Sequence, residues 1–128
     1  MSPAGFPVSG SQLDRITMMS ESGGNPNAVS PAGARGLMQV MPGTARDPGF
    51  GVRPSSGSPQ DDTRVGREYR RAMQQRYGGD LRKMWGAYNW GPGNVDRAIA
   101  RYGEQWLDYA PPETRAYVAQ NLRAARGS

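Results

Sequence analysis

The hydrophobic pattern of the chain begins with a helical segment between residues 11 and 20. Leu13, Ile16 and Met19 recur three residues apart, so we expect them on the buried side of a helix. Ser11 is a suitable N-cap residue, and Asp14 stands three residues later in the capping-box position. The pattern therefore predicts an amphipathic helix that starts at Ser11.

This first helix is expected to end near Glu21. The sequence Gly23-Gly24-Asn25-Pro26 follows, and a helix cannot continue through it because proline lacks a backbone N–H and glycine favours turns. The C-terminal end of a helix carries partial negative charge, which disfavours an ionised carboxylate and raises its pKa. Burial among apolar groups would act in the same direction. Glu21 is therefore a candidate general acid.

The remaining pattern is helical and broken by turns. Residues 27–35 form an expected ordered turn with at most a small hairpin or irregular β segment, and a short helix is predicted through Leu37, Met38 and Val40. Residues 47–59, rich in Gly, Pro and Ser, are expected to form a long surface loop. Four more helices are predicted: from Asp61 or Asp62 to Tyr77, from an Asp80 cap to Trp90, from an Asn94 cap to Tyr102, and from about Glu113 to Ala125.

The class that follows is a mainly α, compact helical domain of about six helices with minimal β structure. The chain of 128 residues suits one domain. We expect a flexible N-terminal segment at 1–10, a single domain at 11–125 and a C-terminal tail at 126–128. There is no apolar run of about 18 residues, so no membrane span is predicted. The segment from Met1 to Ser11 lacks both the basic start and the apolar stretch of a secretory signal.

The chain contains no His and no Cys, which narrows its possible chemistry. Zinc sites built on imidazole or thiolate are excluded. Ser-His-Asp and Cys-His nucleophile systems are excluded as well. Any catalysis must use carboxylates, Tyr, Lys, Arg or hydroxyl groups.

The charge balance favours an anionic partner. Sixteen basic residues face eleven acidic ones, for a net charge of +5, and Lys83 is the only lysine. Nucleic acid and the anionic bacterial envelope both fit this charge. No nucleic-acid motif occurs, and the aromatic residues lie on predicted core stripes, so we do not expect nucleic acid as a partner. Arg67, Arg70 and Arg71 flank an apolar stripe and are interpreted as solvated helix surface.

The eleven acidic side chains can be sorted by position. Glu21 and Glu113 stand beside chain breakers, whereas the other nine are explained by their places in the predicted elements. These nine are helix starts (Asp14, Asp61, Asp62, Asp80), polar helix faces (Glu68, Asp96) and loops (Asp47, Glu104, Asp108). The residues alone leave Glu21 open between a catalytic carboxylate and a solvated helix end. Glu113 is open between a groove role and favourable placement at the positive start of the last helix.

Four blocks of sequence together resemble one known family. They are Glu-Ser-Gly-Gly-Asn-Pro at 21–26, Gly-Leu-Met-Gln with Met-Pro-Gly-Thr-Ala at 36–45, Ala-Tyr-Asn-Trp-Gly-Pro-Gly at 87–93 and Glu-Thr-Arg-Ala-Tyr-Val at 113–118. In this order they resemble the catalytic domain of soluble lytic transglycosylases, lysozyme-like enzymes that cleave the glycan strands of bacterial peptidoglycan. The resemblance runs from about residue 13 to 122 and implies an α+β lysozyme-like fold with a substrate groove.

The resemblance also implies roles for individual residues. Glu21 would be the single catalytic acid and base, with Tyr88 hydrogen-bonded near its carboxylate. The groove would be lined by Ser30, Gln39 and Met41, with Asn89 and Glu113 completing its floor and wall, and with Ser22 and Tyr117 in supporting positions. Position 90 departs from the family, because Trp90 stands where a small residue is more common. No metal or organic cofactor is implied.

The implied chemistry needs only one carboxylate. A protonated Glu21 would donate to the departing glycosidic oxygen as positive charge grows at the anomeric carbon. The N-acetyl group of muramic acid would act as internal nucleophile, and the Glu21 carboxylate would then take the proton of the sugar's own 6-hydroxyl. The product would be a 1,6-anhydromuramoyl end.

Two other functions compete with this one. The first is a hydrolytic muramidase similar to goose-type lysozymes, in which a further carboxylate activates water. The second is a catalytically silent module that binds the cell wall or nucleic acid, as the arginine excess suggests.

The expected setting is the periplasmic or extracellular wall. The 47–52 loop and the 64–69 segment resemble transglycosylase domains of bacteriophage virion proteins, which are carried in the particle and need no signal peptide. We expect a monomer as an isolated domain, within a larger virion or secretion assembly.

Overall fold

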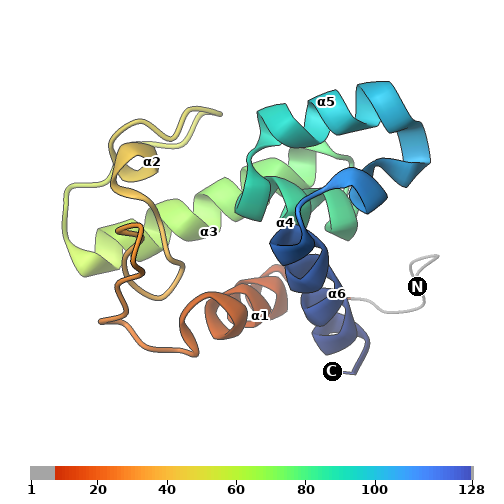
Figure 1. Ribbon diagram of the computed structural model, residues 1–128. Coiled ribbons are helices and arrows are strands. Elements are labelled where there is room, and N and C mark those ends of the chain that lie inside the picture. Colours follow the sequence, from red (N-terminus) through yellow and green to blue (C-terminus); the bar gives the residue numbers. More distant parts are fainter. Residues whose placement is uncertain (1–7, 128) are drawn as a thin grey trace. The chain divides into compact units, whose positions relative to one another are not determined.

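The computed structural model describes residues 8–127, which contain six α-helices and one 3-10 helix (Figure 1). The helices are α1 (Gly10–Ser22), α2 (Pro42–Arg46), α3 (Pro59–Arg76), α4 (Leu81–Trp90), α5 (Pro92–Tyr102), η1 (Gly103–Tyr109) and α6 (Pro112–Gly127). The only β structure among the described residues is a pair of isolated bridges, Val29 to Arg35 and Arg35 to Val40. The prediction of a mainly α class is confirmed.

The chain divides into two compact units, Met1–Ala72 and Met73–Ser128, and the division falls within α3. The predicted flexible segment 1–10 lies largely outside the described residues, of which Gly10 already belongs to α1. The predicted tail at 126–128 begins inside α6, and its last residue is not described. No helix among residues 8–127 is long and apolar enough to cross a membrane.

The N-cap of helix α1 lies two residues earlier than predicted, and the helix itself begins at Gly10. Ser9 is the N-cap: its hydroxyl accepts a hydrogen bond from the Gln12 N–H at 3.2 Å, and the Gln12 side-chain oxygen accepts from the Ser9 N–H at 2.9 Å. This reciprocal pair is a capping box. The prediction of Ser11 and Asp14 as the capping pair is wrong. The sequence offers two such pairs of a serine and a polar residue three positions later, Ser9 with Gln12 and Ser11 with Asp14, and the first pair forms the cap.

Asp14 instead makes an ion pair within the first unit. Its carboxylate accepts a hydrogen bond of 2.6 Å from Nε of Arg70, and the arginine side chain is 1% exposed. The interpretation of Arg70 as solvated surface is therefore wrong. A buried arginine requires such a partner, since leaving the charge unpaired costs several kcal/mol. The pair joins α1 to α3.

The buried side of α1 also differs from the expectation. Leu13 and Thr17 are buried, and the Thr17 hydroxyl is satisfied by the Leu13 carbonyl at 2.8 Å. Met19, predicted to face the core, is 58% exposed. The spacing of four between the two buried residues keeps them on one helical face, whereas Met19 lies off it.

The segment between α1 and α3 is folded mainly by turns and backbone hydrogen bonds. The predicted short helix through residues 37–40 is wrong, because residues 36–39 form a turn whose end pairs with Arg35: the N–H groups of Arg35 and Val40 each donate to the other's carbonyl at 3.1 Å. The helix in this region is α2, which starts after Met41 with a proline at its first position.

The 36–40 turn packs closely on α3. Gly66 faces it, and a Cβ placed there would lie 2.4 Å from Cβ of Met38 and 3.1 Å from Cγ2 of Val40. Met38 is fully buried. The absence of a side chain at position 66 lets the helix backbone approach this turn.

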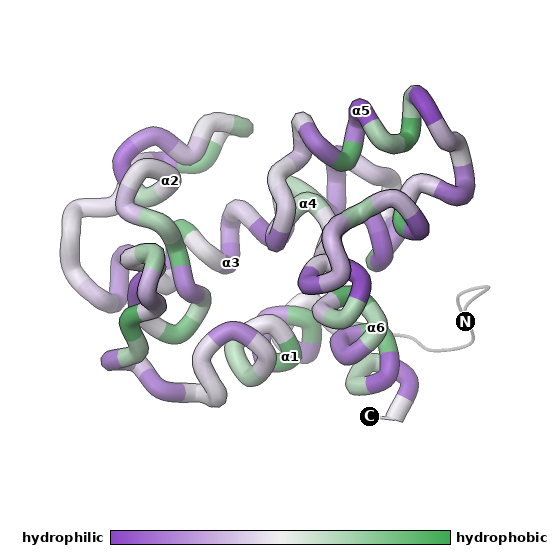
Figure 2. Tube along the Cα trace, in the orientation of Figure 1, coloured by the Kyte–Doolittle hydropathy of each residue, from purple (hydrophilic) through white to green (hydrophobic). Residues whose placement is uncertain are grey.

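In the second unit, α4 packs on both α5 and α6, and α5 packs on η1. The core contains Trp85, Trp106 and Val95, each fully buried. Hydrophobic and hydrophilic residues alternate along α5 (Figure 2), as expected for a helix with one buried face.

The cap of α4 was predicted correctly and that of α5 was not. Asp80 caps α4 by accepting from the Lys83 N–H at 3.2 Å. Gly91, not Asn94, is the N-cap of α5, and Pro92 is its first residue. Asn94 lies inside the first turn, where its side-chain amide donates to the Trp90 carbonyl at 2.7 Å.

Candidate active site

Glu21 lies in the last turn of α1, as the sequence predicted. The helix stops at Gly23, whose φ of 65° is left-handed and whose N–H donates to the Met19 carbonyl at 3.0 Å. A glycine suits this cap because a side chain disfavours that conformation. Glu21 is half-buried and has interactions of its own within the described residues. The carboxylate therefore stands on the last turn of a regular helix, where the backbone is held.

Ser22 ties this helix end to the following turn. Its hydroxyl oxygen lies 2.8 Å from the Leu37 carbonyl and 3.0 Å from the Met18 carbonyl, and it accepts from the Gly24 N–H at 3.2 Å. The hydroxyl has one proton for the two carbonyls. Because Leu37 is fifteen residues away in sequence, this contact fixes the residue next to Glu21 against the 36–40 turn.

Gln39 holds the same turn from within. Its side-chain amide donates to the Gly36 carbonyl at 2.9 Å and to the Ala28 carbonyl at 3.1 Å. Both amide hydrogens are thus used by the protein, so only the amide oxygen can serve a sugar, as an acceptor. Gln39 also has a φ of 51°, an uncommon conformation for a residue with a side chain. Such strain is often found at functional sites.

Ser30 and Met41 lie on either side of this turn in the chain. The Ser30 hydroxyl accepts from the Ala34 N–H at 3.0 Å, while the Ser30 backbone N–H donates to the Ala34 carbonyl at 2.9 Å. Met41 is 42% exposed and precedes α2 as its N-cap. An exposed thioether of this kind offers an adaptable apolar contact.

The other predicted site residues belong to the second unit. Tyr88 and Asn89 are half-buried at the end of α4. Glu113 is exposed in the first turn of α6, and Tyr117, one turn further on, is 8% exposed. The expected hydrogen bonding of Tyr88 near Glu21 stays a prediction.

One residue that the sequence analysis did not single out orients a predicted one. The Thr114 hydroxyl donates to the side-chain oxygen of Asn89 at 2.8 Å, and Thr114 is 1% exposed. With its oxygen engaged, Asn89 keeps its two amide hydrogens for other partners. The sequence does hold a sign of this role: Thr114 is a polar residue in the 113–118 block, one turn before the buried Tyr117 and Val118.

The chain is similar to known proteins of one family. A family model described as the transglycosylase SLT domain matches residues 11–108. The soluble lytic murein transglycosylase of Escherichia coli strain K12 is 38% identical over 115 residues, covering 80% of this chain and 18% of that protein. A relative of the same description from Salmonella typhimurium gives the same identity and coverage.

Two solved structures are also similar. The 70 kDa soluble lytic transglycosylase from Escherichia coli has a TM-score of 0.77 at 29% identity, covering 96% of this chain and 22% of that chain. The second is an inactive mutant of the lytic transglycosylase Slt from Pseudomonas aeruginosa, in which glutamine replaces one glutamate. Its TM-score is 0.73 at 30% identity, covering 88% of this chain and 20% of that chain. The chain thus spans about a fifth of the length of these relatives, and it belongs to the transglycosylase SLT domain family.

Proposed function

We propose that this chain is a peptidoglycan lytic transglycosylase that cleaves the MurNAc-β-1,4-GlcNAc bond without water. The family match and the names of the similar proteins support the activity. The observation that carries the assignment to a residue is the placement of Glu21: it stands on the last helical turn, beside a serine that binds the 36–40 turn. The inactive glutamate-to-glutamine mutant of a similar protein supports a carboxylate mechanism.

Glu21 would act twice in this reaction. Its protonated carboxyl first gives a proton to the glycosidic oxygen, the bond from the muramic C1 to that oxygen breaks, and the N-acetyl oxygen bonds to C1 from the opposite face. The Glu21 carboxylate then removes the proton of the 6-hydroxyl, whose oxygen displaces the N-acetyl oxygen at C1. The proton returns to Glu21, and the product is a 1,6-anhydro ring.

The surrounding residues would bind the glycan. Gln39 would accept a hydrogen bond from a sugar hydroxyl through its amide oxygen, because its hydrogens are used within the turn. The further proposed binding residues are Ser30, Met41, Tyr88, Asn89 and Glu113, with Ser22 and Tyr117 as supports. Ser22 would act indirectly, through the bond that holds the helix end carrying Glu21.

The test is replacement of Glu21 by Gln, which keeps the shape of the side chain and removes its titrating proton. Glu21→Gln should abolish clearing of a cell-wall suspension while leaving sedimentation with the wall intact. Glu104→Gln is the matched control, since the Glu104 side chain is 90% exposed and lies 4.0 Å from Lys83. Full lytic activity in Glu21→Gln would remove this residue from the mechanism. Loss of wall binding without folding defects would contradict a purely chemical role.

The products separate the proposal from hydrolysis. Glycan ends released by the chain should be about 18 Da lighter than the corresponding hydrolysed ends, because ring closure adds no water. Reducing ends with the full mass would identify a hydrolytic muramidase instead.

We further propose that the domain acts on the periplasmic or extracellular wall as part of a larger assembly. The assembly that we favour is a bacteriophage virion. The likeness of the 47–52 and 64–69 segments to virion-borne domains supports this carriage. Detection of the chain by peptide mass spectrometry in purified particles is the expected result. Its absence from particles, together with an encoded secretory leader, would contradict the proposal.

A further inference from the structure

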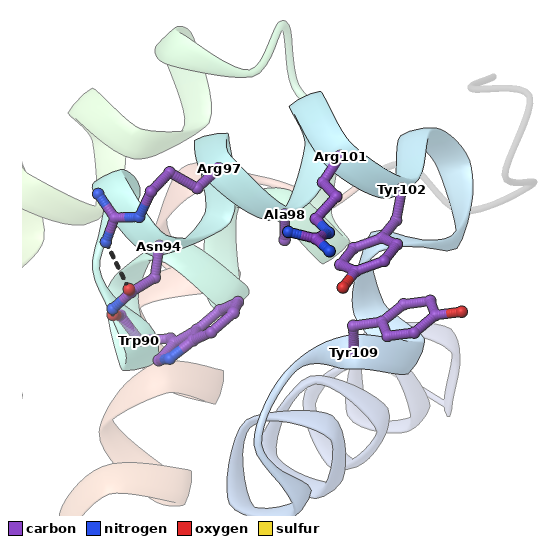
Figure 3. Close-up of a pocket in the computed structure, with 7 residues that line it drawn as sticks. All are labelled: Trp90, Asn94, Arg97, Ala98, Arg101, Tyr102 and Tyr109. Atoms are coloured by element: carbon purple, nitrogen blue, oxygen red, sulfur yellow. Dashed lines mark hydrogen bonds between the residues drawn. The ribbon is translucent and has the colours of Figure 1, made fainter.

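A small cavity in the second unit has the chemistry of an anion site. It has a volume of about 240 Å³ and is lined by residues at the end of α4, along α5 and at the end of η1 (Figure 3). Its lining consists of Trp90, Asn94, Arg97, Ala98, Arg101, Tyr102 and Tyr109. It therefore combines two guanidinium groups with three aromatic rings.

The two arginines lie one helical turn apart on α5 and are not neutralised there. Residues spaced by four lie on the same face of a helix, where like charges repel each other. Within residues 8–127, neither Arg97 nor Arg101 makes an ion pair with a carboxylate. The neighbouring Asp96 feels the charge of Arg97 but is hydrogen-bonded by Arg76 and Tyr77. The positive charge at the cavity is thus available to a ligand.

Both arginines are held by neutral groups. Arg97 Nη2 donates to the Asn94 side-chain oxygen at 2.7 Å, and the Asn94 amide is anchored in turn on the Trp90 carbonyl at 2.7 Å (Figure 3). Arg101 lies with its guanidinium carbon 5.6 Å from the centre of the Tyr102 ring, within the range of a cation–π contact. These contacts orient the guanidinium groups without cancelling their charge.

The aromatic rings give the cavity an apolar wall. Tyr102 and Tyr109 are stacked, with ring centroids 3.6 Å apart and planes 6° from parallel. Tyr109 is 56% exposed and Trp90 is half-buried, so both present surface to solvent. The ligand that fits is a small organic anion: a carboxylate for the guanidinium groups, carried on an apolar or sugar body for the rings.

We propose that this cavity binds the free carboxylate of a peptide attached to the glycan strand. The inference rests on the proposed peptidoglycan substrate, whose stem peptides are a regular source of such carboxylates along the wall. A cavity of about 240 Å³ accommodates one amino-acid residue and its carboxylate, but not a glycan strand. The site would make the chain prefer peptide-bearing strands over bare ones.

The binding test uses N-acetylmuramyl-L-alanyl-D-glutamic acid as the probe and tryptophan fluorescence as the signal. Trp85 and Trp106 are fully buried, so the half-buried Trp90 is the tryptophan that a ligand in this cavity would perturb. The titration is done with the wild-type chain, because the probe has no MurNAc-GlcNAc bond that the proposed reaction could cleave. A saturable signal that disappears in Trp90→Phe is expected.

Charge variants decide the role of the arginines. Arg97→Gln and Arg101→Gln should each weaken binding of the probe roughly tenfold, because a charge-assisted hydrogen bond is lost. Arg123→Gln, an exposed arginine on α6, is the matched control and should change nothing. An unchanged affinity in both cavity variants, or equal binding of the probe with both glutamate carboxylates amidated, would overturn the proposal. Equal competition by inorganic phosphate would overturn the assignment to a carboxylate.

Catalysis separates this inference from the proposed function. Cleavage of peptide-free glycan should be unaffected in Arg97→Gln/Arg101→Gln, whereas KM for peptide-bearing glycan should rise about tenfold or more. If the proposed function fails, no glycan is cleaved by any variant, yet the fluorescence titration still reports on the cavity. If the KM values of the two substrates remain equal in wild type and variant, the proposed preference for peptide-bearing strands is wrong.

Discussion

The packing of Gly66 against the 36–40 turn leads to a quantitative prediction for Gly66→Ala. An alanine Cβ would lie 2.4 Å from Cβ and 2.8 Å from Cγ of Met38. Carbon atoms pack at about 3.5–4.0 Å, so α3 and the turn must separate by about 1 Å. Met38 cannot yield outward easily, because it is fully buried. Trimming Met38 to alanine would not relieve the contact, since the nearest atom is its Cβ.

The magnitude follows from two opposing effects. Forcing extra atoms into a well-packed core costs about 1–3 kcal/mol, and a contact this short belongs at the upper end. Replacing glycine by alanine within a helix gains about 1 kcal/mol. The net expectation is a loss of about 1–2 kcal/mol, which corresponds to a decrease in Tm of roughly 3–10 °C for a domain of this size.

The assay is thermal unfolding followed by circular dichroism, with Gly43→Ala as the matched control. Gly43 lies in α2, and nothing lies within 4 Å of a Cβ placed there. The control should be neutral or stabilised by up to about 1 kcal/mol, because it gains helix propensity without a clash. Lytic activity should fall in Gly66→Ala at temperatures where the variant is folded, since the displaced turn carries Gln39. A Gly66→Ala variant as stable as wild type would refute the packing argument.

Four further predictions concern the second unit. Thr114→Val should leave the fold intact but raise KM for glycan, because the hydroxyl that holds the Asn89 oxygen is lost, and Thr114→Ser should restore KM. Steady-state kinetics of Thr114→Val equal to those of the wild type would exclude a positioning role. Asn121→Leu should raise the free energy of unfolding by about 1–2 kcal/mol in chemical denaturation, because the side-chain nitrogen and oxygen of this buried residue have no hydrogen-bond partner among residues 8–127. A denaturation midpoint below that of the wild type would contradict this prediction. Burial and then the hydrogen bond to Asp96 raise the pKa of Tyr77 from 10.0 to about 12. The contribution of Tyr77 to stability is therefore present below pH 10 and lost as the pH rises towards 12. Tyr77→Phe should remove this alkaline loss of stability, and a Tm profile above pH 10 that is the same in Tyr77→Phe and in wild type would contradict the prediction. Burial acts to raise the pKa of Asp96, but its hydrogen bonds outweigh burial and lower that pKa, so the same network should also weaken in acid, as the pH falls below about 4.

Local patterns predicted the elements better than the contacts between them. The breakers around residues 23–26 and 91–93 end helices as expected, and Asp80 caps α4. By contrast, the ion pair between Asp14 and Arg70 joins residues 56 apart in sequence, so the local pattern could explain each only as a cap or as solvated surface. The apolar residues of the turn at 36–39 have a spacing that favours a helix, so the sequence pattern wrongly predicts one. The left-handed backbone conformation of Gln39 cannot be recognised from the hydrophobic pattern.

The candidate site was named from a resemblance, because elimination alone left two glutamates. The structure adds local reasons for several of those residues: Ser22 binds Leu37, Gln39 spans two carbonyls, and Thr114 engages Asn89. Three of these bonds, from Ser22 to Leu37, from Gln39 to Ala28 and from Thr114 to Asn89, cannot be predicted from local spacing, because each joins groups 11 or more residues apart in sequence. The roles of the site residues in catalysis stay predictions.

The most direct test of the account is to digest peptidoglycan in heavy-oxygen water and to examine the released ends by mass spectrometry. Ring closure by the substrate's own 6-hydroxyl incorporates no solvent oxygen, so the new muramic ends should be anhydro and unlabelled in wild type and in Glu104→Gln. Glu21→Gln should release no ends at all. Labelled reducing ends from the wild-type chain, or unlabelled anhydro ends from Glu21→Gln at the wild-type rate, would contradict the claim that this single glutamate acts first as acid and then as base.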